Sequence, residues 1–448
     1  MSGIASTLLE DGTTLHSLCR VPLILQDNST CSIPRNSDRA QLFRVAKLLV
    51  VDEVTMGHRH MYEAVDRTLR DLRQCPSPFG GLTVLFSGDW KQILPVVPSG
   101  GRTAIVDATL KSSSLWQHVK VVKLQQNMRV ENAHGSSDFA NFLLNIGCHS
   151  TERSQHGIFM MPMPNSYLVP RNLSLTDFCK KLFIDEQDNE LIVPLEKAAF
   201  TRLLAGRVMI CPTNGAVDQV NDIADIVIDQ VRPIQANEEN LTERQEDEAL
   251  EKVYYSYDVL TGDSLEVDVP VEYLHSVTPN GFPRHELKLK KYSCIVLLRN
   301  LDPSNGHCNG SRYMIVKLGE HTITAELLSG PHKGSQVLIP RIEVTTAANC
   351  PLEFTRFQFP VRLAYAMTAH KSQGQTFNKV GIYLPSQFFS HGQLYVALSR
   401  VGRANDVEIM SEPVNVADNA NLPENNFLIK NVVYDEVLGN LRDRISFM

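Results

Sequence analysis

Two acidic residues follow an apolar stretch in the first part of the sequence. Asp52 and Glu53 come directly after the leucines and valines of residues 48–51. Open α/β sheets bind ligands at the carboxyl ends of their strands. In an enzyme that hydrolyses a nucleotide, the first acid would orient Mg²⁺, and the second would position or deprotonate the attacking water. Considered alone, the pair is more simply explained as a solvated strand end.

A second polar segment, residues 86–96, follows another apolar stretch. Its Gly88 permits close approach of the backbone to a ligand, and Asp89 and Gln92 place polar groups at a second strand end. Gln92 could therefore sense a γ-phosphate or the attacking water. An ordinary turn that leads into a segment ended by Pro95 is the alternative, and these residues alone do not exclude it.

Two arginines complete the candidate site. Arg129 follows the polar residues 125–127, and Arg400 ends a helix predicted over residues 394–400. Either arginine could spread positive charge over a transferring phosphoryl group, which raises hydrolysis rates by about 10³ to 10⁵. Most arginines are merely solvated. This alternative is stronger for Arg129 than for Arg400, because an idle charge at the end of an apolar helix is costly.

Residues 366–376 combine two kinds of binding chemistry. Three of their side chains can reach nucleic-acid phosphates: Thr368, His370 and Lys371. Gln373 and Gly374 offer a polar side chain and an unhindered backbone to a nucleotide. A helix C-cap at Gly374 is the structural alternative, and it can hold at the same time.

These residues need a scaffold that brings strand ends together, and the apolar pattern predicts one. Strands buried on both faces and separated by helices indicate a parallel α/β sheet. The expected elements are strands at 46–52, 82–86 and 119–124 and a helix with Met61, Val65, Leu69 and Leu72 on its apolar face. A second α/β segment is expected from a strand at 208–211, a helix capped by Asn214, a helix over 364–371, a strand at 380–384, the helix over 394–400 and a strand at 407–410.

Residues 287–344 change to short β-type segments with turn signals, which predicts a small antiparallel barrel inserted into the second α/β domain. Its strands are expected at 294–298, 313–318, 322–328 and 336–339. Residues 147–198 are irregular and punctuated by Pro and Met, so we expect a connector there. The acidic stretch 238–251 is interpreted as a solvated surface excursion.

Composition narrows the class of protein. The 448 residues, 43% of them hydrophobic, can bury large cores and are enough for roughly two to four domains. The net charge of −7 means that any contact with nucleic acid must use local positive grooves. Nine cysteines without a C-x-x-C pair indicate reduced thiols instead of disulfides or a zinc knuckle. No apolar run is long enough to predict a membrane span, and the first dozen residues lack the Lys and Arg of a targeting peptide.

In this order, the blocks resemble the Pif-type (petite integration frequency) DNA helicases, especially their Helitron-transposon-like branch. The resemblance covers nearly the whole chain. The matching blocks are Ser2–Ala5, Thr13–Ser17, Asp52–Met56, Gly88–Val96, Asn127–Arg129, Leu297–Leu301, Asn309–Arg312, Gln358–Val361, Thr368–Thr376, Tyr395–Val401 and Asn431–Tyr434.

The resemblance implies an α/β fold with two RecA-like P-loop NTPase domains, each with a parallel sheet, and an SH3-like β-barrel insertion in the second. The implied division is a first RecA-like domain at 1–146, a connector at 147–198, a second RecA-like domain at 199–286 and 345–448, and the insertion at 287–344. It also implies ATP and Mg²⁺ as cofactors. The implied protein is a monomer that moves 5′ to 3′ on single-stranded DNA and unwinds duplex junctions.

The same resemblance assigns roles to the candidate residues. Asp52 belongs to the shell of the metal ion, Glu53 is the catalytic base, and Gln92 reads the γ-phosphate. Arg129 and Arg400 become arginine fingers. The remaining assignments are Gln373 and Gly374 at the nucleotide, and His16, Thr368, His370 and Lys371 toward the DNA.

One departure from the family pattern concerns the phosphates. Family members carry a Gly-rich P-loop with Gly-Lys-Thr before the block at Ser2, whereas these 448 residues contain no Gly-Lys dipeptide. The loop supplies backbone N–H donors and a Lys to the phosphates and a hydroxyl to Mg²⁺. Losing three charge-assisted bonds of about 1.5–2 kcal/mol each lowers ATP affinity by roughly 10³ to 10⁴. We therefore expect the chain as written to be unstable or inactive as an ATPase, with unpaired strand edges in its first sheet.

Three functional hypotheses remain open. The first is a Pif-type DNA helicase whose P-loop is encoded upstream, active in DNA repair, recombination and telomere maintenance or in Helitron transposition. The second is a catalytically dead DNA-binding relic of a decayed transposon helicase. A nuclease that uses Asp52 and Glu53 for metal is disfavoured, because no other cluster of Asp, Glu or His has suitable spacing. A nuclear location follows from the family alone.

Overall fold

The computed structural model describes residues 3–6, 9, 12–148, 158–184, 194–233, 250–262, 269–346, 352–411 and 428–439. The chain divides into two compact units. Unit 1 comprises Met1–Arg171, Ile210–Thr213 and Thr368–Met448, and unit 2 comprises Asn172–Met209 and Asn214–Met367. The acidic stretch predicted as a surface excursion lies outside the described residues over positions 238–249.

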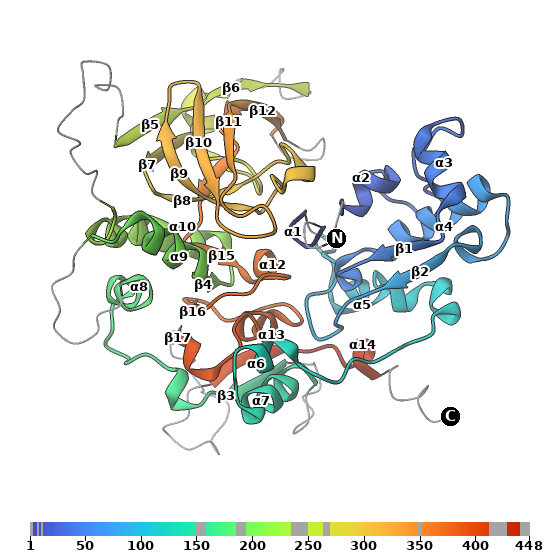
Figure 1. Cartoon of the computed structure of the whole chain (residues 1–448), viewed down its shortest axis with the longest axis horizontal. Helices are drawn as coiled ribbons and strands as arrows, with labels where there is room; N and C mark the ends of the chain where they lie inside the picture. The colour runs from blue at the N-terminus through green and yellow to red at the C-terminus, as the bar shows by residue number, and fades with distance from the viewer. Residues whose placement is uncertain are drawn as a thin grey trace. The chain divides into compact units, whose positions relative to one another are not determined.

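The first sheet of unit 1 pairs β1 (Leu48–Val51) with β2 (Thr83–Phe86) in parallel, with Val51 opposite Phe86. Figure 1 shows helix α4 (Arg59–Arg73) beside these strands. The predicted apolar face of that helix is buried at all four positions: Met61, Val65, Leu69 and Leu72. This face packs in one core with the inward residues of β1, so the predicted strand–helix–strand order is confirmed.

The first sheet differs from its prediction in two respects. Only one face of β1 and β2 is covered, and the side chains of Leu48, Val50 and Leu85 are exposed. The strand predicted at 119–124 is wrong, since no strand is formed there and Leu124 is 91% exposed. Apolar, β-branched composition favours a strand only where a neighbouring strand and a covering layer are present. Among the described residues, neither β1 nor β2 has a second partner strand.

The remaining helices of the N-terminal part of unit 1 are short. They are α1 (Gly3–Ser6), α2 (Leu15–Cys19), α3 (Asp38–Val45), α5 (Arg102–Asp107), α6 (Met128–Asn132) and α7 (Ser137–Cys148). Helix α3 begins at a serine cap, because the Ser37 hydroxyl accepts a hydrogen bond from the Ala40 amide.

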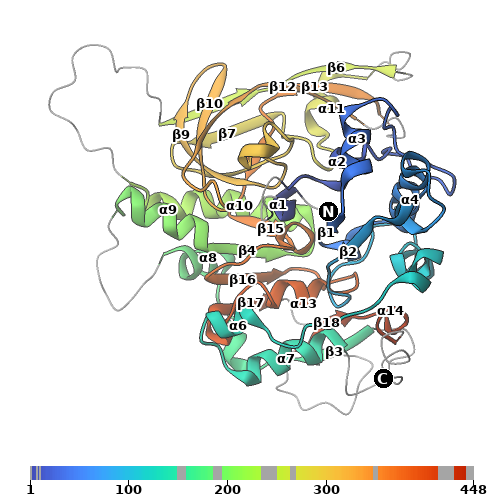
Figure 2. The ribbon, with the colours of Figure 1, turned by 45° about the vertical axis from the view of Figure 1, so that its right-hand side comes forward.

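The C-terminal part of unit 1 carries a second parallel pair of strands. Strands β16 (Lys379–Leu384) and β17 (Val407–Ser411) pair in parallel, and β18 (Leu428–Val432) pairs antiparallel with β3 (Ile158–Pro162), as Figure 2 shows. The helices are α12 (Ala369–Ser372), α13 (Gln393–Leu398) and α14 (Asp435–Gly439).

Two further predictions need correction in these regions. Of the helix predicted over 364–371, the first half is strand β15 (Ala366–Thr368), and only the short α12 is helical. The irregular connector predicted at 147–198 contains both β3 and the helix α8 (Leu175–Phe183). Its Pro and Met content conceals these elements because β3 has no alternating pattern and gains its partner, β18, from residues far away in the sequence.

Unit 2 joins helices to antiparallel strands. Its helices are α8, α9 (Lys197–Gly206), α10 (Asn214–Val227) and α11 (Val271–Ser276), and it holds most of strand β4 (Arg207–Cys211). Asn214 was predicted to cap α10, but it is the first residue of that helix. The sequence also predicts an apolar face at Val217, Val220, Ala224 and Val227; the last three are buried, and Val217 is half-buried.

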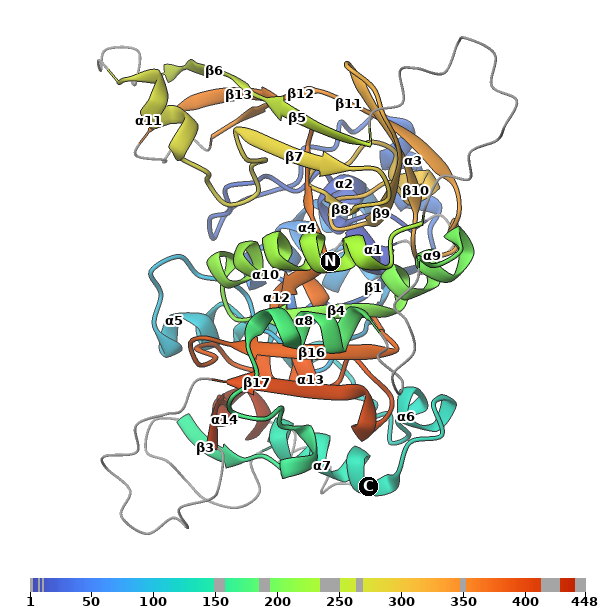
Figure 3. The same ribbon diagram turned by 90° about the vertical axis from the view of Figure 1, so that its left-hand side faces the viewer.

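The antiparallel strands of unit 2 form three sheets. A five-stranded sheet has the order β11-β10-β9-β8-β14, a three-stranded sheet has the order β12-β13-β6, and β5 pairs with β7 (Figure 3). The strands are β5 (Glu251–Tyr255), β6 (Tyr257–Leu260), β7 (Glu286–Lys290), β8 (Cys294–Leu297), β9 (Arg312–Leu318), β10 (Thr322–Leu327), β11 (Gln336–Pro340), β12 (Ile342–Thr345), β13 (Phe354–Gln358) and β14 (Val361–Leu363). All four strands predicted inside 287–344 are present. The antiparallel pairing extends beyond those bounds through β5, β6, β13 and β14, and the predicted domain boundaries stay a prediction.

The three-stranded sheet buries an ion pair. The side chains of Arg356 and Asp258 are both fully buried, and their shortest N–O distance is 2.6 Å. Arg356 also donates to the carbonyl oxygens of Pro283 and Leu274. The guanidinium is therefore compensated by a carboxylate and two carbonyls, which a buried charge requires.

Two negative findings concern the described residues alone. None of the described helices has both the length and the apolar character needed to cross a bilayer. All eight cysteines in the described part of the chain are free.

Candidate nucleotide-hydrolysis site

Backbone hydrogen bonds join the ends of β1 and β2 at the point where the acidic residues begin. The Ser87 amide donates to the Val51 carbonyl, and the Val54 amide donates to the Ser87 carbonyl, both at 2.9 Å. A Cβ atom on Gly88 would lie 3.1 Å from the Val54 side chain, so glycine suits this close approach. These contacts place Asp52 and Glu53 beside the loop that follows β2.

Glu53 has an unusual backbone conformation. Its φ of 54° and ψ of 42° lie in the left-handed region, which non-glycine residues seldom adopt. Its amide donates to the Asp52 carboxylate at 2.9 Å, which helps to hold the turn. Such a conformation costs about 1–3 kcal/mol and concentrates at functional sites.

The Glu53 carboxylate meets Gln373, from the segment after α12. Gln373 Nε2 donates to Glu53 Oε2 at 2.8 Å, and Gln373 is only 3% exposed. Burial raises the pKa of Glu53 above its usual value, the hydrogen bond from Gln373 opposes this, and the neighbouring Asp52 charge adds to it. A carboxylate with a raised pKa, held by one amide, is suited to accept a proton from water.

Arg400 lies two residues beyond the end of α13 and is 1% exposed. Its guanidinium donates to the carbonyl oxygens of Ser372, Gln375 and Val396 and to the Ser399 hydroxyl. Burial, reinforced by the nearby charge of Arg129, lowers the pKa of Arg400 to about 9, while Glu53 opposes the shift. The guanidinium remains charged at neutral pH and is rigidly held.

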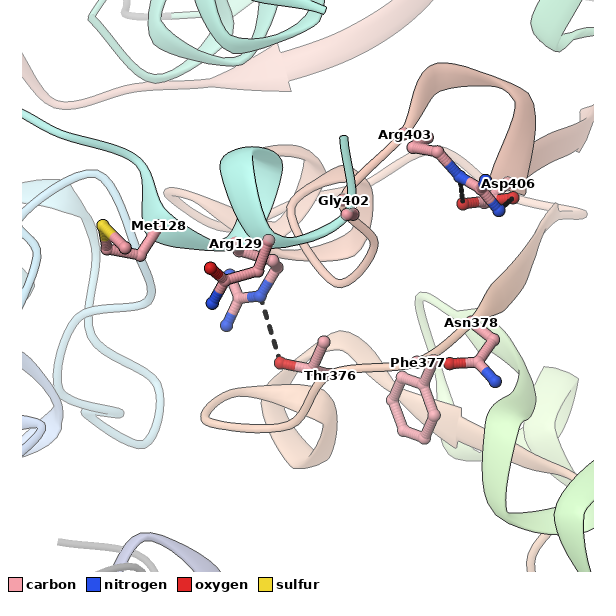
Figure 4. A pocket seen from close by; sticks show the side chains of 10 residues that line it. Met128, Arg129, Thr376, Phe377, Asn378, Gly402, Arg403 and Asp406 are labelled. Carbon is pink, nitrogen blue, oxygen red and sulfur yellow. Dashed lines mark hydrogen bonds and ion pairs between the residues drawn. The ribbon is translucent and has the colours of Figure 1, made fainter. Parts of the chain in front are cut away.

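Arg129, at the start of α6, lies beside the same residues. Its Nε donates to the Thr376 hydroxyl at 3.0 Å and its Nη1 donates to the Ser399 carbonyl at 2.8 Å. Burial lowers its pKa, and Tyr395 and Glu53 oppose the shift. Arg129 and Thr376 both line a pocket of about 610 Å³, and Figure 4 shows the hydrogen bond between them.

The loop after β2 contributes further polar groups. The Gln92 amide donates to the Asp89 carbonyl at 2.9 Å, and Asp89 Oδ2 accepts a hydrogen bond from Tyr395 at 2.8 Å. Among the described residues, the side-chain oxygens of Gln92 and Gln373 are buried without a partner. Two buried acceptors without donors are typical of a site that a ligand or an ordered water completes.

These groups fit part of a magnesium–nucleotide site. Asp52 and Glu53 supply the hard oxygen ligands that Mg²⁺ prefers, and Arg129 and Arg400 supply cations for phosphate oxygens. Mg²⁺ held by these acids would neutralise charge on the phosphates. The predicted residues Glu53, Gln373, Arg129 and Arg400 are brought together, and Gln92 is linked to them through Asp89 and Tyr395.

Gly374 lies at the end of a helix, as the C-cap interpretation of this segment predicts. Helix α12 ends at Ser372 with Gln373 as its C-cap residue, and Gly374 has a φ of 77°, which glycine adopts without strain. The left-handed turn also directs the preceding Gln373 toward Glu53. The structural and functional interpretations of this segment are therefore compatible.

The four residues predicted to face DNA lie in, or directly before, two helices of unit 1. His16 is in α2, Thr368 precedes α12, and His370 and Lys371 are within it. His16 and His370 are partly buried, and burial lowers the pKa of each, so both imidazoles are neutral at pH 7. Lys371 is exposed. Their assignment to DNA stays a prediction.

Three residues that organise the site had no role in the prediction from sequence. Thr376 and Ser399 hold Arg129, and His391 bonds to the loop of Gln92. Thr376 and Ser399 lay inside matched blocks. The only local signal for His391 was its position just before Gly392 at the start of α13, because its partners are 301 and 43 positions away in the sequence.

A separate cluster in unit 2 resembles a metal site in composition. Ligand atoms of Asp258, His275 and His285 lie within 4.8 Å of one another. The two imidazoles are stacked at 3.6 Å with an interplanar angle of 9°, so their in-plane lone pairs do not converge on one point. The Asp258 carboxylate is bonded to Arg356 through both oxygens. Packing around the buried ion pair explains this cluster.

Comparisons with known proteins match two parts of this chain to family profiles. The profile of the PIF1-like helicase family matches residues 1–157, and that of the DNA helicase Pif1 2B domain matches residues 272–318. The first match contains Asp52, Glu53, Gln92 and Arg129. The second contains β7 and β8 and the whole of β9.

Curated relatives are similar over most of this chain. The ATP-dependent DNA helicase PIF1 of Xenopus laevis is 22% identical over 89% of this chain and 52% of its own length. The PIF6 helicase of Trypanosoma brucei brucei is 25% identical over 82% of this chain and 41% of its own. The chain thus spans about half the length of these relatives.

Solved structures show the same fold. A structure of two coordinating Pif1 helicases at forked double-stranded DNA has a TM-score of 0.59 at 22% identity, covering 91% of this chain and 80% of its own. Pif1 from Candida albicans has a TM-score of 0.56 at 21% identity, covering 96% and 84%. The α/β architecture with parallel sheets, the ordered blocks and the profile matches agree with one another. The chain is similar to the PIF1-like helicases over residues 1–157 and to the Pif1 2B domain over residues 272–318.

Proposed function

We propose that this chain is the motor part of a DNA helicase, in which ATP hydrolysis drives 5′ to 3′ movement along single-stranded DNA and unwinding of duplex junctions. The hydrogen bond between Glu53 and Gln373, near the buried Arg400 and the half-buried Arg129, is the observation that carries the proposal. It joins the acidic end of β1 to the segment that precedes β16. Hydrolysis at such a junction can be coupled to movement of the chain.

Each group has a chemical task in this proposal. Asp52 and Glu53 hold Mg²⁺ and water, and Glu53 accepts the proton of the water. Arg129 and Arg400 bind the phosphate oxygens on which charge develops. Gln92 orients the water through its unpartnered side-chain oxygen. His16, Thr368, His370 and Lys371 contact the DNA backbone, and the strands of residues 287–344 form the SH3-like insertion.

The backbone and Lys donors of a P-loop would add to these arginines at the phosphates, and these 448 residues contain no Gly-Lys dipeptide. We propose that the chain alone is inactive and that turnover requires a Gly-Lys-Thr loop joined to it. The exposed Leu48, Val50 and Leu85 support this, since another strand and helix could cover them. A DNA-binding relic is the second candidate function, and the same observation favours it if no such loop is encoded.

The test compares two forms of the protein. One is the 448-residue chain, and the other carries a strand, a Gly-rich P-loop and a helix in front of it. ATP turnover stimulated by single-stranded DNA is expected only for the second form, together with unwinding of forks that have a 5′ tail and not of forks that have a 3′ tail. Failure of both forms to hydrolyse ATP, with retained DNA binding, would support the relic. Reversed tail preference would refute the direction.

Assignment to DNA repair, recombination, telomere maintenance or Helitron transposition, a nuclear location and a monomeric state belong to the same proposal. They rest on the resemblance to Pif-type helicases. Chromatin fractionation and sedimentation of the expressed protein would test the last two.

A further inference from the structure

The segment from His391 to Arg400 contacts the loop of Gln92 at its first residues and contributes Arg400 at its last. His391 is fully buried and lies between two backbone groups. Its Nδ1 accepts a hydrogen bond from the Tyr434 amide at 2.9 Å, and its Nε2 lies 2.9 Å from the Trp90 carbonyl. Because an amide can only donate, Nδ1 must be the acceptor, and Nε2 must carry the proton that it donates to Trp90. One neutral tautomer satisfies both contacts.

Gly392 brings the two backbones into direct contact. Its φ is 74°, and a Cβ atom at this position would lie 2.5 Å from the Lys91 carbonyl oxygen and 2.7 Å from the Gln92 carbonyl carbon. Any side chain here would push the Gln92 loop away. Gly392 is therefore needed for close approach as well as for its backbone conformation.

Tyr395 makes the third contact, one turn into α13. Its hydroxyl donates to Asp89 Oδ2 at 2.8 Å, while Asp89 Oδ1 accepts from the Lys91 amide at 3.1 Å. The carboxylate thus folds its own loop and fastens it to the helix. The backbone N–H of Gln92 donates to the backbone carbonyl of Asp89, so Gln92 is held next to the residue that Tyr395 binds.

We propose that His391 and Tyr395 are positioning residues that fix Gln92 relative to Arg400. The proposal rests on the proposed function, because it concerns the geometry of the same hydrolysis site. One rigid segment sets both the distance and the orientation between a water-orienting amide and a phosphate-binding guanidinium. A misplacement of about 1 Å at such a site can reduce turnover by about 100-fold.

The chain contains its own reporter for this contact. It has only two tryptophans, Trp90 and Trp116, and their rings meet edge to face at 5.8 Å. Trp90 is the residue whose carbonyl accepts the His391 proton. The substitution Trp116→Phe leaves Trp90 as the sole tryptophan, so fluorescence of the full chain then reports on the loop.

Two variants in the Trp116→Phe background test the proposal. Tyr395→Phe removes one hydroxyl, and His391→Phe removes both ring nitrogens while keeping a planar ring. We expect a red-shifted Trp90 emission with about twofold stronger acrylamide quenching in each variant. Tyr167→Phe is the matched control, since this buried tyrosine packs on Phe142, away from the loop, and should leave the emission unchanged.

Kinetics separate a positioning role from loop anchoring alone. In the form with the P-loop segment, each variant should lower kcat about tenfold or more while KM for ATP stays within about twofold. If His391→Phe fails to fold, Tyr395→Phe still decides the matter. Unchanged Trp90 emission in Tyr395→Phe overturns the proposal whether or not ATP is hydrolysed. Altered emission with unchanged kcat overturns the positioning role alone. If the unsubstituted protein hydrolyses no ATP, the proposed function fails, and the positioning role fails with it.

Discussion

Gln373 Nε2 donates a hydrogen bond of 2.8 Å to Glu53 Oε2, joining two residues that are 320 positions apart in the sequence. The bond holds the carboxylate that would accept a proton from water. It comes from a segment that also supplies two carbonyl oxygens to Arg400. ATP turnover is expected only for the protein that carries the P-loop segment in front of the 448 residues, so turnover is to be measured on that form.

Replacing Glu53 by Gln should abolish proton transfer and leave the shape of the site intact. A glutamine keeps one oxygen acceptor for Gln373 but cannot take a proton at neutral pH. We expect kcat to fall about 10²- to 10⁴-fold with little change in nucleotide affinity. Steady-state ATPase and nucleotide titration would measure this. Glu63→Gln, which changes a glutamate of α4, is the control, and a similar kcat loss there would remove the special role of Glu53.

The pH dependence of turnover should reflect the buried position of Glu53. The active form of a general base is deprotonated, so turnover is lost as pH falls through its pKa. Burial raises this pKa above the usual 4.5, and the Gln373 hydrogen bond lowers it. The acid limb of kcat should therefore lie above pH 4.5, and Gln373→Ala should move it to still higher pH. A limb that stays in place, or moves down, would contradict this account. Gln375→Ala, two residues on, is the matched control.

Arg400 should not be replaceable by lysine. Its guanidinium makes four hydrogen bonds in a fixed plane, and an ammonium group cannot reproduce that fork. We expect Arg400→Lys and Arg400→Ala each to reduce kcat about 10³-fold or more. Arg403→Lys, at an arginine that is 57% exposed and paired with Asp406, should have little effect. Near-normal turnover in Arg400→Lys would show that the planar fork is dispensable.

The stability of the chain should decline below pH 6.5 because of His391. Burial lowers the pKa of His391 from its ordinary 6.5 to about 4. Between these values the unfolded chain binds more protons than the folded chain, so stability is present above pH 6.5 and is lost as pH falls toward 4. The full difference corresponds to about 3 kcal/mol, of which about 2 kcal/mol falls between pH 7 and pH 5. Urea unfolding at pH 7 and pH 5 would measure it.

The control for this measurement is the exposed His118. His391→Gln should flatten the dependence of stability on pH over this window, whereas His118→Gln should leave it as it is. An equally steep decline in His391→Gln would assign the effect to other groups.

Breaking the buried Arg356–Asp258 ion pair of unit 2 should lower the unfolding free energy far more than breaking an exposed ion pair with a similar N–O distance. Asp258→Asn leaves the Arg356 guanidinium buried without a countercharge, which should cost about 3–5 kcal/mol of unfolding free energy. Asp71→Asn breaks the Arg35–Asp71 pair, which also measures 2.6 Å but is exposed at 69% and 48%, and should cost about 1 kcal/mol or less. Thermal denaturation of both variants gives the comparison. Equal losses would contradict the burial argument.

The strand ends and the long amphipathic helix were predictable because their signals are local. Asp52 and Glu53 directly follow β1, and α4 carries four apolar residues at helical spacing. Each element can therefore be recognised from a few neighbouring residues. The resemblance to a helicase family then gave an order to segments that have no local relation. Gln373 and Arg400 could be named as partners of Glu53 only through that order.

Other parts depended on contacts that no local pattern reveals. Residues 119–124 have the composition of a strand, yet they pair with no strand, and Val121, Val122 and Leu124 are exposed. Strand β3 was missed for the opposite reason, since it gains its partner β18 from about 270 residues away. The role of His391 depends on two backbone groups that are distant in sequence. Only a three-dimensional arrangement shows such residues.

Because of the left-handed backbone of Glu53, stability and activity make opposite demands on this position. Glycine at this position would relieve about 1 kcal/mol of conformational strain, because it adopts a positive φ without penalty. It would also delete the carboxylate. Selection of this protein for heat tolerance alone would therefore favour a loss of the catalytic base, and any engineering programme must screen for turnover at each round.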